Sequence, residues 1–110
     1  MINKVKKEIK ELIKKLEINC SIKEFQDKVD WNIISKFQKL SEDFIKEFKE
    51  IVNWNNISWK QKLSEDFIYD FQDKLDMDFL IENNKITKNR LLELKKINSI
   101  HSRFEILDIR

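Results

Sequence analysis

Glycine, proline and alanine are absent from the 110 residues of this chain, and cysteine and histidine occur once each. Without glycine the chain has no phosphate-binding P-loop, dinucleotide-binding fingerprint or nucleophile elbow, because each requires backbone torsions or a close approach that only glycine permits. The single Cys20 excludes an internal disulfide, and the single His101 excludes a cluster of imidazole metal ligands. Most nucleotide-dependent enzymes are therefore excluded, and a reducing environment is favoured.

Long apolar segments are also missing. The longest apolar run is Phe79-Leu80-Ile81, far shorter than a signal-peptide core or a membrane span. We therefore expect no membrane association and a cytoplasmic location, inside a host cell.

Charge is abundant but nearly balanced, with 22 Lys and Arg against 20 Asp and Glu. The two ends of the chain are basic, and most of the acidic excess lies between residues 65 and 82. Such a cluster is typical either of a solvated face or of a surface that attracts a basic partner.

An internal repeat is the strongest feature that is present. The eight residues Gln38–Ile45 recur letter for letter as Gln61–Ile68, an offset of 23 residues. The same offset relates two further columns of large side chains: Phe25, Phe48, Phe71 and Leu94, and then Trp31, Trp54 and Met77. These columns indicate about three repeats and a partial fourth.

Each repeat is predicted to contain two short helices. Apolar residues recur at the 3.6-residue helical period, and polar residues that favour the N-cap position precede each apolar group. The predicted caps of the first helices are Ser41, Ser64 and Thr87, and those of the second helices are Asp30, Asn53 and Asp76. A strand at Trp31 to Ser35, as in leucine-rich repeats, is the alternative.

The predicted fold is therefore all-α: a small solenoid of short two-helix repeats with an N-terminal amphipathic capping helix over residues 2–17. Short helices are marginal alone, so neighbouring repeats must bury each other's Phe/Ile and Trp/Ile faces. We expect a single domain, 1–110, in which 1–19 form the cap, 20–86 about three repeats, and 87–110 a partial repeat and C-terminal cap. The last predicted helix is Thr87 to Asn98, whereas residues 99–110 fit a helix or an edge strand.

The repeat motif, Phe-x-x-x-Val-Asp/Asn-Trp-Asn-x-Ile-Ser-x-x-Gln-Lys-Leu-Ser-Glu-Asp-Phe-Ile, resembles a short tandem repeat found in giant-virus, phage and low-GC bacterial proteins. The resemblance covers roughly Ile22 to Leu94, and Met77, Ile81 and Asn84 depart from it in the third repeat. It implies a viral or mobile-element setting and a host-directed binding protein. It implies no catalytic residue.

Candidate binding residues are those at which the repeats differ, because repeat proteins carry specificity there. Trp59 replaces the Lys36 of the preceding repeat, and Tyr69 replaces Lys46. The acidic members of the predicted site are Asp66, Asp70, Asp73 and Asp78. A calcium site at Asp70, Asp73, Asp76 and Asp78 is disfavoured, since a helical segment without glycine does not provide converging oxygens.

These patterns predict a non-enzymatic protein-binding repeat protein with no catalytic residue, metal or cofactor. The expected partner is a protein with a basic surface, and the viral resemblance suggests a host nucleic-acid machine such as a defence nuclease, inhibited in the manner of an anti-CRISPR protein. Two alternatives stay open: direct binding of nucleic acid by the basic ends, and a structural module that self-associates.

Overall fold

The computed structural model describes the backbone of residues 1–108 and the side chains of residues 1–99. Residues 1–108 form eight helices and no strand, so the described chain is all-α, as predicted. Trp31–Phe37 forms a helix, and the leucine-rich alternative with a strand there is wrong. No helix of the described residues is both long enough and apolar enough to cross a membrane.

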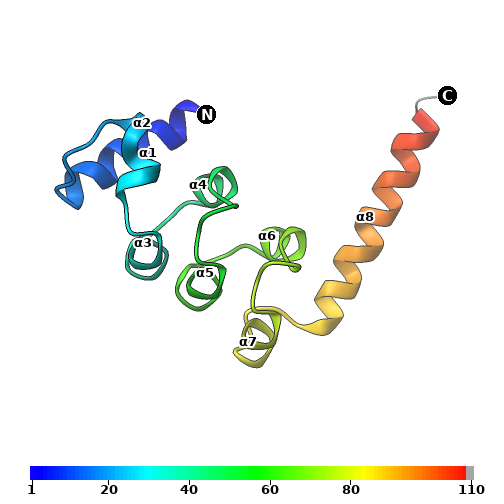
Figure 1. The fold of residues 1–110 in the computed structure, drawn as a ribbon. Coiled ribbons are helices and arrows are strands. Elements are labelled where there is room, and N and C mark those ends of the chain that lie inside the picture. The colour runs from blue at the N-terminus through cyan, green and yellow to red at the C-terminus, as the bar shows by residue number, and fades with distance from the viewer. Residues whose placement is uncertain (109–110) are drawn as a thin grey trace. The chain divides into compact units, whose positions relative to one another are not determined.

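The chain forms two compact units, which are described in turn: Met1–Gln61 and Lys62–Arg110. The predicted division into a cap, three repeats and a partial repeat stays a prediction. The N-terminal unit contains α1 (Asn3–Lys15), α2 (Ile22–Lys28), α3 (Trp31–Phe37), α4 (Glu42–Glu47) and α5 (Trp54–Lys60). Within it α3 and α5 pack side by side, and α1 packs on α2 and α4 (Figure 1).

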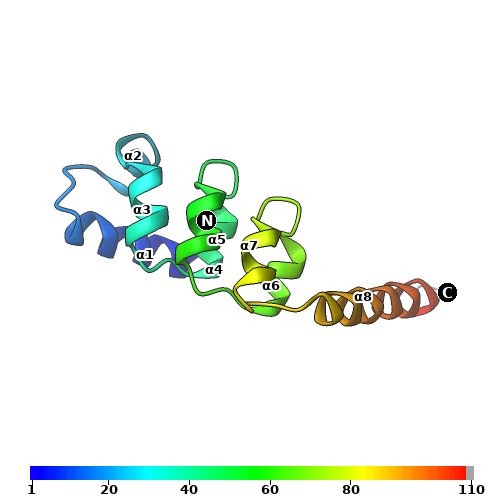
Figure 2. The same ribbon diagram turned by 90° about the horizontal axis from the view of Figure 1, so that it is seen from below.

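The C-terminal unit contains α6 (Glu65–Asp70), α7 (Met77–Glu82) and α8 (Lys88–Asp108), and α6 packs on the first part of α8 (Figure 2). The last helix does not end near Asn98 as expected but continues to Asp108, so the edge-strand alternative for the tail is wrong for residues 99–108. The side chains of Ile100, Phe104 and Leu107 lie outside the described side chains.

The predicted caps explain where the short helices begin. In each case a side-chain oxygen accepts a hydrogen bond from the backbone N–H three residues later, which satisfies one of the donors that a helix start leaves unpaired. The residues that do this at the six predicted positions are Asp30, Ser41, Asn53, Ser64, Asp76 and Thr87. Ser21 caps α2 in the same way.

Buried side chains recur at the repeat interval in both units. The buried set includes three groups at 23-residue spacing: Ile34, Ile57 and Leu80; Phe44 and Phe67; Ile45 and Ile68. Trp31 and Trp54, expected in the core, are half-buried instead. Their indole N–H groups donate to the carbonyls of Gln26 (3.0 Å) and Lys49 (2.9 Å), so each Trp holds the turn that precedes its helix.

A polar joint links α3 to α5 in the N-terminal unit. The Gln61 side chain donates to the carbonyl oxygens of Ser35 (3.0 Å) and Gln38 (2.7 Å) and accepts from the Leu40 N–H (3.0 Å). The Asn53 amide donates to the Asn32 side chain at 2.7 Å. Gln61, just after α5, thus satisfies carbonyl groups that α3 leaves unpaired at its C-terminal end.

Two residues adopt the left-handed conformation that usually belongs to glycine: Glu17 (φ 55°) and Asn84 (φ 57°). Both follow the end of a helix, and in each case the next N–H donates back to a carbonyl five residues earlier, Ile18 to Ile13 and Lys85 to Leu80. This is the Schellman pattern of helix termination. A chain without glycine must place other residues there, and asparagine tolerates the position better than glutamate.

Candidate functional site

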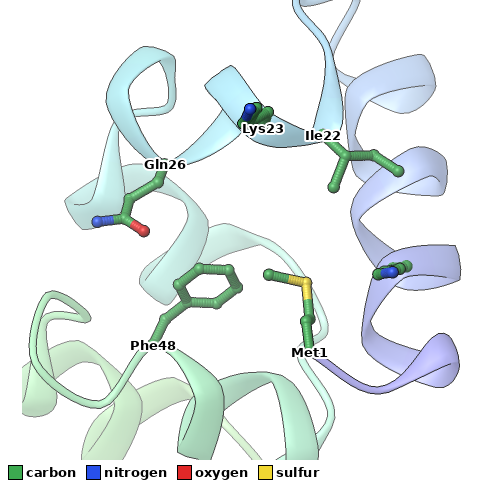
Figure 3. A pocket seen from close by; sticks show the side chains of 6 residues that line it. Met1, Ile22, Lys23, Gln26 and Phe48 are labelled. Carbon is green, nitrogen blue, oxygen red and sulfur yellow. The ribbon is translucent and has the colours of Figure 1, made fainter.

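The N-terminal unit has an open pocket of about 430 Å³ beside α2, shown in Figure 3. Met1, Ile22 and Phe48 supply apolar walls, and the side chains of Lys6, Lys23 and Gln26 complete the lining. The pocket thus combines an apolar floor with two cations. Reasoning from the sequence missed it, because Met1 and Lys6 come from the cap segment whereas the other residues come from the repeats.

A capping box and an aromatic cluster fix the walls of this pocket. Ser21 and Glu24 exchange hydrogen bonds at the start of α2, with the Ser21 N–H 3.1 Å from Glu24 Oε1 and the Glu24 N–H 3.2 Å from Ser21 Oγ. The Ser21 hydroxyl also donates to Glu24 Oε1, at 3.0 Å. The two bonds that the carboxylate accepts from Ser21, the backbone bond first, lower the pKa of the Glu24 carboxyl from its ordinary value of 4.5. The Phe48 ring packs against the rings of Trp31 and Phe44, whose centroids lie 5.0 and 4.9 Å from its own.

The C-terminal unit has a groove of about 480 Å³ between α6 and α8. Tyr69 and Gln72 line one side, and the other side is formed by four residues of α8: Lys88, Leu91, Leu92 and Lys95. Leu92 is largely exposed. Tyr69, predicted to bind a partner, is therefore half-buried at the rim of an apolar groove that also carries two cations.

The pocket and the groove share two repeat positions among their lining residues. Lys23 in the pocket and Tyr69 in the groove are separated by two repeats of 23 residues, and so are Gln26 and Gln72. In both units, therefore, a surface hollow lies beside the first helix of a repeat. The residue at one of the two shared positions differs, Lys in one unit and Tyr in the other, whereas the other position is Gln in both.

The predicted acidic residues are all exposed in the C-terminal unit. Asp66 and Asp70 lie one turn apart on α6 with Tyr69 between them in sequence, and Asp73 follows in the turn after α6. Asp66 and Asp70 therefore have the i, i+4 spacing that places two side chains on one helix face, whereas Asp73 lies beyond the end of the helix. Asp78 is separate: it belongs to the first turn of α7, where its negative charge also favours the helix N-terminus.

Basic residues of α8 offset part of this acidic field, which the count over residues 65–82 could not reveal. Arg90 of α8 contacts Glu65 at 3.1 Å and Glu93 at 2.9 Å. These hydrogen bonds, to Glu93 first and then to Glu65, raise the pKa of the Arg90 guanidinium. Residues 62–110 contain nine Lys and Arg against ten Asp and Glu, so the C-terminal unit is nearly neutral as a whole. We call its three exposed acids nearest to Tyr69 in sequence, Asp66, Asp70 and Asp73, the acidic patch.

Trp59 belongs to the N-terminal unit, on α5, where its side chain is 45% exposed. The residue at its position in the preceding repeat is Lys36, which is exposed as well. Trp59 therefore lies at the surface of this unit. Its predicted role in binding stays a prediction, as do those of Tyr69 and the four aspartates.

Charged residues of α1 are partly occupied by structural contacts. Lys4 pairs with Asp43 at 3.3 Å, and Glu8 accepts hydrogen bonds from the N–H and the hydroxyl of Ser41 at the start of α4. These contacts anchor α1 to the first turn of α4. Within the described residues, no group of three or more His, Cys, Asp or Glu side chains is arranged to hold a metal ion.

Comparisons with protein-family models, with curated proteins and with solved structures each found no match to this chain.

Proposed function

We propose that this chain is a non-enzymatic protein-binding protein built as a solenoid of 23-residue, two-helix repeats with α1 as its N-terminal cap. Three local features recur at the repeat interval and support the solenoid: the helix caps, the buried Phe and Ile positions, and the indole hydrogen bonds of Trp31 and Trp54. The polar joint between α3 and α5 provides one example of how successive repeats stack.

The observation that carries the binding function is the shared use of repeat positions by the pocket and the groove. In both units a hollow lies at the same place in the repeat, and one side chain at that place differs between the units. Repeat proteins build extended recognition surfaces in this way. Tyr69 has the properties of an interface anchor, because a half-buried tyrosine offers a large rigid area and a polar tip.

A basic protein surface is the proposed partner. Among the described side chains, the structure gives Asp66, Asp70 and Asp73 no ion pair of the kind that Arg90 makes with Glu65. Asp66 and Asp70 lie on α6, the helix that bears Tyr69, and Asp73 lies in the turn after it; all three carboxylates are exposed. Opposite charge on a partner would speed encounter and fix its orientation. Trp59 is proposed as a second contact residue of the N-terminal unit.

The proposed biological setting is that of a phage or viral protein that inhibits a host nucleic-acid machine, such as a defence nuclease. It rests on the resemblance of the repeat motif and on the acidic patch, since a carboxylate array competes for surfaces that normally bind phosphates. The proposed location is the interior of the host cell.

Affinity capture from a host lysate, followed by identification and purification of the captured protein, tests the proposal. We expect a defined partner whose affinity falls at least tenfold on Tyr69→Ala and on the Asp70→Lys/Asp73→Lys double variant, with a smaller loss on Trp59→Ala. Asp27→Lys is the matched control, because Asp27 occupies the repeat position of Asp73 in α2 and is exposed. It should bind like the unchanged protein.

Equal capture by all of these variants would overturn the site. Capture that disappears when the lysate is treated with nuclease, with purified nucleic acid binding less tightly as salt rises, would instead identify direct nucleic-acid binding as the function.

A further inference from the structure

The second helices of the repeats have two edges, one toward the preceding repeat and one toward the next. In the N-terminal unit the joint between α3 and α5 shows which positions belong to each. The α5 edge that meets α3 carries Asn53, Asn56 and Gln61, and Asn56 donates to the Asn32 carbonyl at 3.3 Å. The α3 edge that receives them carries Asn32 and Ser35, and the Asn53 N–H donates to Ser35 Oγ at 3.1 Å.

The corresponding positions of α3 face the other way, away from α5, and two of them carry exposed apolar side chains. One repeat earlier than Asn56 and Gln61 stand Ile33 and Gln38; together with Phe37, the exposed residue next to Gln38, we call them the upstream edge. Ile33 is 48% exposed and Phe37 67% exposed. Within the described part of the chain, Gln38 Oε1 is buried without a hydrogen-bond partner, whereas its counterpart Gln61 Oε1 accepts from Leu40. α1 packs mainly on α2 and α4, and α3 packs mainly on α5.

The last second helix, α7, differs from α3 and α5 on its opposite edge. The serine that is almost completely buried in the earlier helices, Ser35 (0% exposed) and Ser58 (2%), is replaced by Ile81, which is half-buried. The position of Asn32 is taken by the exposed Asp78. We call Asp78 and Ile81 the downstream edge.

The substitutions at these two edges complement each other. The joint between α3 and α5 pairs amide and hydroxyl side chains, but each of the two edges has an apolar residue at one of these positions: Ile33 stands where α5 has Asn56, and Ile81 stands where α3 has Ser35. The two edges also carry opposite charge. Lys36 Nζ lies 5.2 Å from the centre of the Phe37 ring on the upstream edge, and Asp78 lies on the downstream edge.

We propose that a second copy of this chain docks here, with the downstream edge on α7 of one copy packed against the upstream edge on α3 of the next. The contact is heterologous, so it repeats from copy to copy and produces short head-to-tail chains. It uses the packing mode already present between α3 and α5, with an apolar contact in place of the amide pairs. This inference is independent of the proposed partner protein.

The test uses substitutions that the chain itself carries at equivalent positions. Ile33→Asn/Phe37→Lys gives α3 the residues of α5, and Ile81→Ser gives α7 the residue of α3 and α5, so both variants should stay folded by circular dichroism. We expect the mean mass of the unchanged protein to rise with concentration in sedimentation equilibrium from the micromolar to the millimolar range. Ile97→Asn, at an exposed apolar residue of α8, should behave like the unchanged protein.

Mixing distinguishes this contact from other modes of association. Each edge variant alone should remain monomeric, because it retains only one functional edge, but an equimolar mixture of the two should form dimers and nothing larger. A monomeric unchanged protein at millimolar concentration would overturn the proposal. Dimers of Ile81→Ser alone would also overturn it, since they would mean that two upstream edges pair with each other.

Discussion

Gln61 makes the most testable single contribution to the fold. Its amide forms three hydrogen bonds with backbone groups of the preceding repeat: the Ser35 and Gln38 carbonyls and the Leu40 N–H. A protein hydrogen bond contributes about 0.5–1.5 kcal/mol net, and an acceptor left buried and unpaired costs more. Because Gln61 is half-buried, water replaces part of the loss. We therefore expect Gln61→Ala to lower the free energy of unfolding by about 2 kcal/mol.

Gln38→Ala is the matched control, because the same residue one repeat earlier has a buried Oε1 without a partner. Gln38→Ala removes an unsatisfied acceptor, and this gain offsets part of any loss of stability. We therefore expect the free energy of unfolding to fall by no more than ~0.5 kcal/mol. Urea unfolding, followed by circular dichroism and by tryptophan fluorescence, measures both variants. For a chain of this size, the Gln61 loss corresponds to a midpoint about 10 °C lower on heating. Equal losses for the two variants would refute the assignment of the amide as the link between repeats.

Three further predictions concern local structure. Glu17→Gly should raise the free energy of unfolding by about 1 kcal/mol in urea titrations, because glycine adopts the positive φ of residue 17 without steric cost. Asn84→Gly should raise it by less. A lower free energy of unfolding for Glu17→Gly would contradict this prediction. Trp54→Phe should cost about 1–2 kcal/mol in the same assay, since the Lys49 carbonyl loses its indole donor, and a neutral effect would count against that bond. NMR titration should place the pKa of the Glu24 carboxyl below 4.5. The ionised carboxylate then stabilises the fold above pH 4.5, and this stabilisation is lost as the pH falls through the folded-state pKa. An unshifted pKa would disprove this prediction.

The helix starts were predictable because the signal is local. A side chain such as Ser64 or Asp76 satisfies an N–H only three residues away, so the sequence contains the whole interaction. The same holds for the repeat interval, which is visible as identical letters at Gln38–Ile45 and Gln61–Ile68. Local chemistry and exact repetition together gave the all-α class and the six caps.

The groove and the pocket were less predictable, because each joins residues that are distant in sequence. The sequence points to Tyr69 because it departs from the repeat. Its neighbours Lys88 and Lys95, however, come from α8 and bring positive charge close to α6, whose own charged residues are all acidic. In the same way, the pairing of Arg90 with Glu65 spans 25 positions, and no count over a window of sequence includes both. Long-range packing decides these features.

The length of α8 was also missed. The repeat pattern predicts a helix that ends at Asn98, because the next cap position in the 23-residue register is Ser99, but the helix continues to Asp108. Asn98 does not act as a cap; its side chain donates to the Leu94 carbonyl at 2.7 Å, inside the helix. A register inferred from earlier repeats thus fails where the array stops.

The claim that supports both proposals is the stacking of 23-residue units, and inserting one whole unit tests it most directly. A second copy of residues 39–61 placed after Gln61 should fold, with the same helical signal per residue in circular dichroism and an unfolding midpoint equal to or above that of the unchanged chain. An insertion of half that length at the same point should destabilise the protein, because it disrupts the register. If the full-unit insertion unfolds the chain as readily as the half-unit insertion, the helices do not form a periodic stack.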